Sequence, residues 1–173
     1  MSPTNDRGAA KAAEFVGAEC GCALDSAERK TMTIPESVRN LISTGPLAHV
    51  TTLNSDGSPQ VTVVWVGIED DEIVSGHLHL HHKLKNIHRD PRVAVSLQSL
   101  SKNAIGLQEY LVIYGDARVT EGGAVPLLQR LARIYMGPDT DFPPAELRDR
   151  PGFVTRITPR RFVGVGPWSS RQA

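Results

Sequence analysis

Residues 45–66, GPLAHVTTLNSDGSPQVTVVWV, decide the fold because they contain two β-rich runs on either side of a turn signal. Both runs are rich in Val and Thr, which favour strands, and Asp56-Gly57 between them is typical of a hairpin turn. The sequence therefore predicts a β-hairpin whose strands cover residues 47–53 and 60–68.

The elements predicted outside the hairpin do not alternate as they do in a dinucleotide-binding fold. No β-α-β unit repeats, and no glycine-rich turn joins a strand to a long helix. About six short strands and a few helices instead predict a mainly β protein, a small six-stranded antiparallel barrel with flanking helices. Beyond the hairpin, the predicted elements are a helix over Thr33–Ile42 capped by Thr33, a strand over Ile73–Leu80, a short helix over Lys83–Arg89, strands over residues 93–97 and Tyr110–Val119, a helix over Val125–Met136 and a strand over Phe153–Val165.

Length and charge limit the classes of function. The chain of 173 residues has 19 basic and 19 acidic residues, so it lacks the broad positive field that a nucleic-acid or polybasic membrane binder needs. It has no apolar run long enough for a membrane span, and its first residues lack the apolar core of a secretory signal. We therefore expect a cytoplasmic protein with a flexible arm over residues 1–33, one domain over 34–168 and a tail over 169–173. Cys20 and Cys22 are interpreted as reduced thiols.

Five of the six histidines lie in residues 75–92, SGHLHLHHKLKNIHRDPR. In the predicted strand, His77, His79 and His81 alternate with leucines, so their imidazoles are expected to share one face. Three interpretations are open at this point: a metal site, an anion site and a solvated strand edge.

The lysines that follow the histidines separate the first two interpretations. A metal ion beside Lys83 and Lys85 would be repelled by their ammonium groups, and the sequence therefore predicts no metal site. An anion is favoured, because the imidazoles, Lys83 and the free N–H groups of a helix that starts near His82 are expected to face one point. This combination is typical of a phosphate site.

Three stretches together resemble the pyridoxamine 5′-phosphate oxidase-like split-barrel superfamily and, within it, the flavin or deazaflavin oxidoreductases that use coenzyme F420. They are residues 45–66, the segment HHKLKNIHRDPRVAVSL at 81–97 and the segment YLVIYGDARVT at 110–120. The strongest element is Lys83-x-x-Asn86-Ile87-x-x-Asp90-Pro91-Arg92-Val93, a basic residue, a short helix and a step into the next strand. The resemblance covers about residues 34–168.

The resemblance implies a split barrel that pairs as a homodimer, with the cofactor ring in a groove at the dimer interface. It implies that Lys83 contacts the cofactor phosphate with His81 and His82, and that Asn86 braces the start of the helix. The backbone of β-rich residues 61–64 would lie along the ring, next to two histidines of the adjacent strand. The cofactor-binding residues implied in this way are Val61, Thr62, Val63, Val64, His77, His79, His81, His82, Lys83 and Asn86.

Departures from the family pattern limit which reaction and which cofactor are favoured. Where the pyridoxamine phosphate oxidases carry arginines, this chain has His82 and Val112, so oxidation of vitamin B6 is not favoured. Coenzyme F420 is favoured over FMN because its acidic tail would need further cations. The candidates for that role are Lys85, Arg89, Lys102, Arg160 and Arg161.

The resemblance thus implies an oxidoreductase whose cofactor passes hydride to a small unsaturated or aromatic substrate, with no catalytic side chain assigned. The alternatives are an FMN-binding oxidoreductase of the same fold and a non-catalytic cofactor- or tetrapyrrole-binding protein. The substrate pocket is expected in the loops at residues 99–108 and 137–150. Trp65 is interpreted as a core residue, whereas Trp168 is predicted either to cover a partner's groove or to pack at the terminus.

Overall fold

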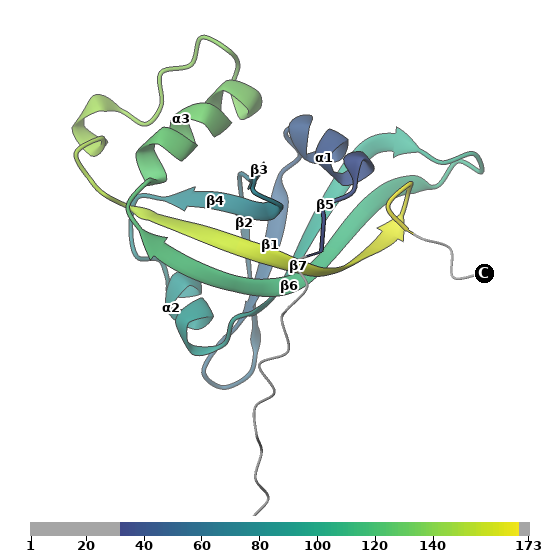
Figure 1. Ribbon diagram of the computed structural model, residues 1–173, viewed down its shortest axis with the longest axis horizontal. Helices are drawn as coiled ribbons and strands as arrows, with labels where there is room; N and C mark the ends of the chain where they lie inside the picture. The colour runs from purple at the N-terminus through teal and green to yellow at the C-terminus, as the bar shows by residue number, and fades with distance from the viewer. Residues whose placement is uncertain (1–31, 170–173) are drawn as a thin grey trace, which may run out of the picture.

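The structure, a computed structural model, describes residues 32–169, so nearly all of the predicted arm, with Cys20 and Cys22, and most of the predicted tail lie outside the described residues. Seven strands, three α-helices and one short 3₁₀ helix make up the described part (Figure 1). Their bounds are α1 Glu36–Ser43, β1 Ala48–Leu53, β2 Pro59–Val64, β3 Gly67–Glu69, β4 Glu72–His77, α2 His82–Arg89, β5 Arg92–Lys102, β6 Gln108–Glu121, α3 Ala124–Tyr135, η1 Ala145–Leu147 and β7 Phe153–Val165.

The strands form one antiparallel sheet in the order β2-β1-β5-β6-β7-β4-β3. The long strands β5, β6 and β7 form its centre, while β2 and β3 are its two edges. The mainly β, antiparallel architecture with flanking helices is therefore confirmed. There are seven strands rather than six, because the strand predicted over residues 60–68 breaks at Trp65 and continues as β3.

The predicted hairpin is confirmed, with its turn at Asp56-Gly57. β1 pairs with β2 from Ala48 opposite Val64 to Leu53 opposite Pro59. Its turn contains Gly57 at φ 82°, a left-handed conformation that glycine adopts without a steric penalty. The Asp56 carboxylate closes the turn by accepting a hydrogen bond from Ser58 N–H at 2.9 Å.

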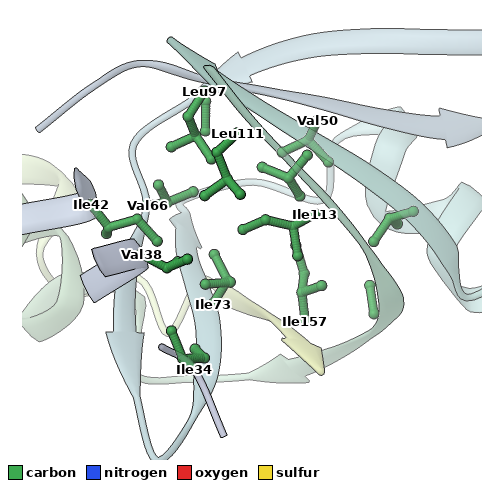
Figure 2. Close-up of a cluster of buried hydrophobic side chains, with 14 of the residues drawn as sticks. Ile34, Val38, Ile42, Val50, Val66, Ile73, Leu97, Leu111, Ile113 and Ile157 are labelled. Carbon is green, nitrogen blue, oxygen red and sulfur yellow. The ribbon is translucent and has the colours of Figure 1, made fainter. Parts of the chain in front are cut away.

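One cluster of aliphatic side chains fills the inside of the sheet and is covered by α1 (Figure 2). Each fully buried aliphatic side chain contributes roughly 1.5–3 kcal/mol relative to an exposed one, so this cluster dominates stability. Trp168 also packs into the cluster and donates from Nε1 to the Tyr110 carbonyl at 2.9 Å. Of its two predicted roles, packing at the terminus is the one that the structure supports.

Helix α3 packs on the outer side of β4. Its buried Leu127 and Leu131 meet Val74 and Val154 in a second, smaller apolar cluster. Gly76 makes this contact close, because a Cβ at this position would lie 2.9 Å from Leu128 Cγ. The predicted bounds of this helix are shifted by one residue.

Two predicted boundaries, the start of the first helix and the end of the third strand, differ from the structure. The first helix begins at Glu36 with Pro35 at its N-cap, and no side chain caps it, so Thr33 is not its cap. The strand predicted to run to Leu80 ends at His77, because its partner β7 begins at Phe153 opposite His77 and offers no further hydrogen bonds. The last strand, Phe153–Val165, has the predicted bounds.

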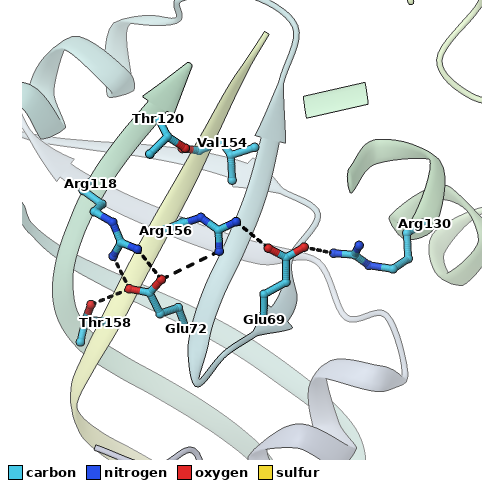
Figure 3. A network of polar contacts seen from close by, with 8 residues as sticks. All are labelled: Glu69, Glu72, Arg118, Thr120, Arg130, Val154, Arg156 and Thr158. Atoms are coloured by element: carbon cyan, nitrogen blue, oxygen red, sulfur yellow. Dashed lines mark hydrogen bonds and ion pairs between the residues drawn. The ribbon is translucent and has the colours of Figure 1, made fainter. Parts of the chain in front are cut away.

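A chain of ion pairs connects β3 and β4 to the neighbouring strands and to α3 (Figure 3). Glu72 is held by both guanidinium nitrogens of Arg118, one at 2.7 Å, and by the Thr158 hydroxyl at 2.9 Å. Arg156 donates to Glu69 at 2.7 Å, and Arg130 of α3 pairs with the same carboxylate. Hydrogen bonds from Arg118 lower the pKa of Glu72, although burial opposes this shift.

Candidate cofactor-binding groove

Helix α2 starts at His82, close to the predicted Lys83, and ends at Asp90-Pro91, where proline prevents continuation. The buried side of this short helix faces the sheet, next to β1 and β6. No side chain caps its N-terminus, so its first N–H groups are available to an external acceptor. The side chains on its buried side are Lys83, Leu84, Asn86 and Ile87.

Asn86 fastens α2 to the β1–β2 hairpin. Its side chain is fully buried, and Nδ2 lies 2.9 Å from Asn54 Oδ1, 2.9 Å from Gln60 Oε1 and 3.1 Å from Thr52 Oγ1. Arg89 reinforces this connection by donating to the Leu53 carbonyl. Asn86 therefore connects α2 to the hairpin, and it shares Asn54 Oδ1 with His82 at the start of the helix, which the resemblance implied it braces.

Lys83 is only 8% exposed, yet no Asp or Glu in residues 32–169 forms an ion pair with it. Burial lowers its pKa, since the charged form loses hydration. Buried charges are normally paired, and the Lys83 ammonium, which faces a groove and has no carboxylate beside it among the described residues, is chemically suited to bind an anion.

Lys83 lines a groove of about 280 Å³ between the β2 edge and the end of β4. The predicted residues that line this groove with it are Val63, Val64 and His77. Five further lining residues were not predicted to bind the cofactor: Leu47, Trp65, Gly76, Leu128 and Phe142. Of these, Phe142 lies in the loop at residues 137–150, where the substrate pocket was expected.

His77 is buried at one wall of the groove. Burial, together with the charges of Lys83 and His81, lowers its pKa to about 3. Its Nε2 lies 3.1 Å from Thr155 Oγ1, which fixes the orientation of the ring. At neutral pH, His77 is therefore an uncharged, oriented hydrogen-bonding group.

The other predicted histidines lie outside the groove lining. Because β4 ends at His77, His79 and His81 do not share its strand face, although both the His77–His81 and the His79–His81 ring centroids are 6.1 Å apart. His79 Nδ1 is 3.2 Å from Arg150 Nη1, a cation that the sequence did not indicate. His82 turns to the hairpin and lies 3.2 Å from Asn54 Oδ1.

Val61 and Thr62 lie on β2 outside the groove lining. Val61 is exposed on the same side of the strand as Val63, whereas the Thr62 hydroxyl is buried without a hydrogen-bond partner among the described residues. Of residues 61–64, Val63 and Val64 line the groove.

A larger cavity, about 760 Å³, lies elsewhere, and its lining includes Arg160, a predicted candidate cation for the acidic tail of the cofactor. Among the described residues, Glu72 pairs with Arg118 and Asp116 with Arg160, while Asp70 in the same lining forms no ion pair. The uncompensated charge of this cavity is therefore acidic, opposite in sign to that of Lys83 in the smaller groove.

The described residues were also compared with the requirements for metal binding and for a membrane-spanning helix. No cluster of three or more His, Cys, Asp or Glu side chains within residues 32–169 is arranged to hold a metal ion. No helix in the same part of the chain is both long and apolar enough to cross a membrane.

Comparison with known proteins places these features in a family. The family model described as pyridoxamine 5′-phosphate oxidase matches residues 34–165. No curated protein matches the chain. Among solved structures, an F420 reductase has a TM-score of 0.59 and 26% identity over 75% of this chain and 98% of its own.

Two further structures share the fold at lower identity. A conserved hypothetical protein from Mycobacterium tuberculosis has a TM-score of 0.60 and 23% identity, covering 79% of this chain and 87% of its own. HupZ of Group A Streptococcus has a TM-score of 0.55 and 16% identity, covering 79% of this chain and 98% of its own.

Proposed function

Because this chain belongs to the pyridoxamine 5′-phosphate oxidase family, we propose that it is an oxidoreductase that binds coenzyme F420 in the groove beside Lys83. FMN is the alternative cofactor. The substrate is a small unsaturated or aromatic molecule. The observation that carries the proposal is the buried Lys83 at the N-terminus of α2, which forms no ion pair with any described residue and where a phosphate would complete the charge balance.

The residues of this chain would bind and orient, while the bound cofactor supplies hydride transfer. Lys83 and the first N–H groups of α2 would hold the phosphate. Val63 and Val64 would flank the ring at the strand edge. His77 would offer a hydrogen bond in a fixed direction, and its pKa of about 3 argues against a role as imidazolium acid at neutral pH.

The positions of the cations support F420 only in part. Three of the predicted cations for the acidic tail have other partners: Arg89 at Leu53, Arg160 at Asp116, and Arg161 over the Tyr114 ring at 4.6 Å. Lys85 on α2 and Arg150 beside His79 are the cations that best fit a tail leaving the groove. The F420 reductase with 26% identity supports the same choice.

The proposal of a homodimer is supported by the face of β2, β1 and β5 that carries His49 and Thr51. Strand pairing places His49 between Val63 and Ser96, and Thr51 between Val61 and Ala94. These two rows contain no carboxylate, and both valines are more than half exposed. A second copy covering this face would also complete the groove at the β2 edge. A mass of twice 18.8 kDa by light scattering is expected, and a mass of 18.8 kDa would contradict it.

Side-by-side titration of the purified protein with F420 and FMN tests the function, with cofactor fluorescence as the signal. Lys83→Ala should weaken cofactor binding by more than tenfold, since a charge-assisted contact is worth about 1.5–3 kcal/mol. Arg133→Ala, an equal charge change at an exposed residue of α3, is the control and should leave affinity unchanged.

The outcomes separate the candidates. Tighter binding of F420 supports the proposal, and exclusive binding of FMN selects the alternative. A Soret band in the purified protein would instead indicate a tetrapyrrole. Equal affinity of the Lys83→Ala and Arg133→Ala variants would refute the phosphate assignment.

A further inference from the structure

The hairpin between β5 and β6 extends beyond the rest of the sheet. β1 pairs with β5 only as far as Leu97, and β7 pairs with β6 only from Tyr110 onwards. In the described part of the chain, no third strand therefore borders residues 98–109, which Figure 1 shows as an arm that projects past the other strands. At about 3.3 Å per residue, the arm reaches roughly 15 Å beyond its last neighbouring strand.

Three large aliphatic side chains are exposed at the end of this arm, which we call the hairpin tip (residues 99–108). The exposed fractions are 99% for Leu100, 79% for Ile105 and 52% for Leu107. Leu100 has the highest exposed fraction of any large apolar side chain in residues 32–169. A single exposed leucine is common, but three such side chains on one projecting loop indicate an interaction surface.

The polar groups of the hairpin tip bind one another. Asn103 N–H donates to the Leu107 carbonyl and Gly106 N–H to the Asn103 carbonyl, both at 2.9 Å. Asn103 Oδ1 accepts from Ile105 N–H at 3.1 Å and from Leu107 N–H at 2.9 Å. Gln108 Nε2 donates to two carbonyls of the facing strand at 2.6 Å. A backbone that is hydrogen-bonded in this way loses little when it leaves water for an apolar medium.

The charge of the arm favours an anionic partner. Lys102 carries the only charge between Arg92 and Glu109, so no carboxylate accompanies it at the hairpin tip. It was expected among the cations for the acidic tail of the cofactor, but it does not line the cofactor groove. A lysine beside aliphatic side chains suits a lipid surface, because its ammonium can stay among anionic headgroups while its neighbours enter the acyl region.

A second copy of the chain is the other candidate occupant of the hairpin tip. The face proposed for the homodimer carries His49 and Thr51, where β1 is paired on both sides. The hairpin tip lies past Leu97, the last residue of β5 that pairs with β1. A copy that covers the face of β2, β1 and β5 therefore does not need to cover the hairpin tip.

We propose that the hairpin tip binds the surface of an anionic lipid bilayer, with Leu100, Ile105 and Leu107 inserted below the headgroups and Lys102 among them. The contact is peripheral and reversible, because three side chains bury much less apolar surface than a membrane-spanning helix does. A net charge of zero is compatible with it, since insertion of aliphatic side chains needs no broad positive field. The inference does not depend on the proposed cofactor or reaction.

Sedimentation with vesicles tests this contact. The purified full chain is mixed with vesicles of phosphatidylglycerol and phosphatidylcholine in equal parts, and the bound fraction is measured against lipid concentration. We expect saturable binding, which Leu100→Ser and Ile105→Ser should each weaken about tenfold through the loss of inserted apolar surface. Lys102→Gln should weaken it about fivefold on these vesicles and should have no effect on pure phosphatidylcholine.

The matched control removes an exposed apolar side chain elsewhere. Met136 is 55% exposed at the end of α3, and Met136→Ser should bind vesicles as the wild type does. All four variants replace exposed side chains, and circular dichroism checks that they fold. The assay needs no cofactor, so failure of the proposed oxidoreductase function would leave its result unchanged.

Light scattering of the same variants tests the second copy as the occupant. If the wild type does not sediment with the vesicles and Leu100→Ser lowers the mass of the protein in solution, the hairpin tip is a contact between copies and the lipid proposal is wrong. Sedimentation that is the same for the wild type, Leu100→Ser and Ile105→Ser would also overturn the proposal. Vesicle binding that depends on the hairpin tip, with an unchanged mass in solution, supports it.

Discussion

Lys83 and Glu72 are both buried charged residues, but they differ in whether the chain provides groups of opposite charge around them. Glu72 is contacted by Arg118, Arg156 and Thr158, so its charge is balanced by the chain itself. Lys83 is as deeply buried and has no carboxylate partner among the described residues. A buried charge that is paired with opposite charges stabilises the fold, whereas a buried charge without such a partner is a candidate ligand-binding group.

The largest expected effect comes from removing the unbalanced charge. Lys83→Met should weaken binding of the phosphate-containing cofactor by more than tenfold. It should leave the free energy of unfolding equal or slightly raised, because an apolar side chain replaces a buried unpaired charge. Cofactor titration and urea unfolding measure the two quantities. If Lys83→Met lowered the free energy of unfolding but kept full cofactor affinity, Lys83 would be a structural residue like Glu72 and not a cofactor-binding residue.

Removing the paired charge of Glu72 should lower stability and leave cofactor affinity unchanged, the reverse of the effects expected for Lys83→Met. Glu72→Gln removes the charge that Arg118 and Arg156 face, and we expect a loss of about 1–2 kcal/mol in the free energy of unfolding. Part of the full value is lost to solvent screening, because Arg118 is half exposed. Cofactor affinity should not change. Urea unfolding of this variant beside Lys83→Met gives the contrast directly.

The smallest effect concerns His77 and pH. Its folded pKa of about 3 lies below the ordinary value of 6.5, so the unfolded chain binds the extra proton first as pH falls. Stability is therefore full above pH 6.5 and declines below it, by about 1 kcal/mol between pH 6.5 and 5.5.

Unfolding by urea at several pH values in this interval measures that decline. His77→Gln, which retains a hydrogen-bonding group toward Thr155, should largely remove it. His88→Gln, at an exposed histidine of α2, is the control and should retain it. An unchanged pH dependence in His77→Gln would assign the decline to other groups.

Much of the fold was predictable because its signals are local. The turn at Asp56-Gly57 fixed the hairpin register, and the stretch from Phe153 to Val165 was recognisable as one strand. Errors arose where pairing decides the end of an element. The alternating histidines continue the strand pattern after His77, but β7 offers them no partner there, so His79 and His81 leave the strand.

The candidate site was predictable mainly at its basic end. Lys83 stands in a recognisable run of charged residues, and the same run predicts that a helix starts beside it. The apolar end has a weaker signal. Phe142 lies in the proline-rich loop at residues 137–150, where the substrate pocket was expected, whereas Leu128 resembles any other leucine on an amphipathic helix.

The sequence by itself determined the antiparallel architecture, the hairpin and the short helix that carries Lys83, because turn residues, alternation and a terminating proline act over a few neighbours. Only the tertiary structure decided that Lys83 is buried without a carboxylate and that Trp65, Leu128 and Phe142 meet across the same groove. Charge balance and cavity shape depend on groups far apart in the chain, and a local pattern carries no information about which distant side chains will face one another.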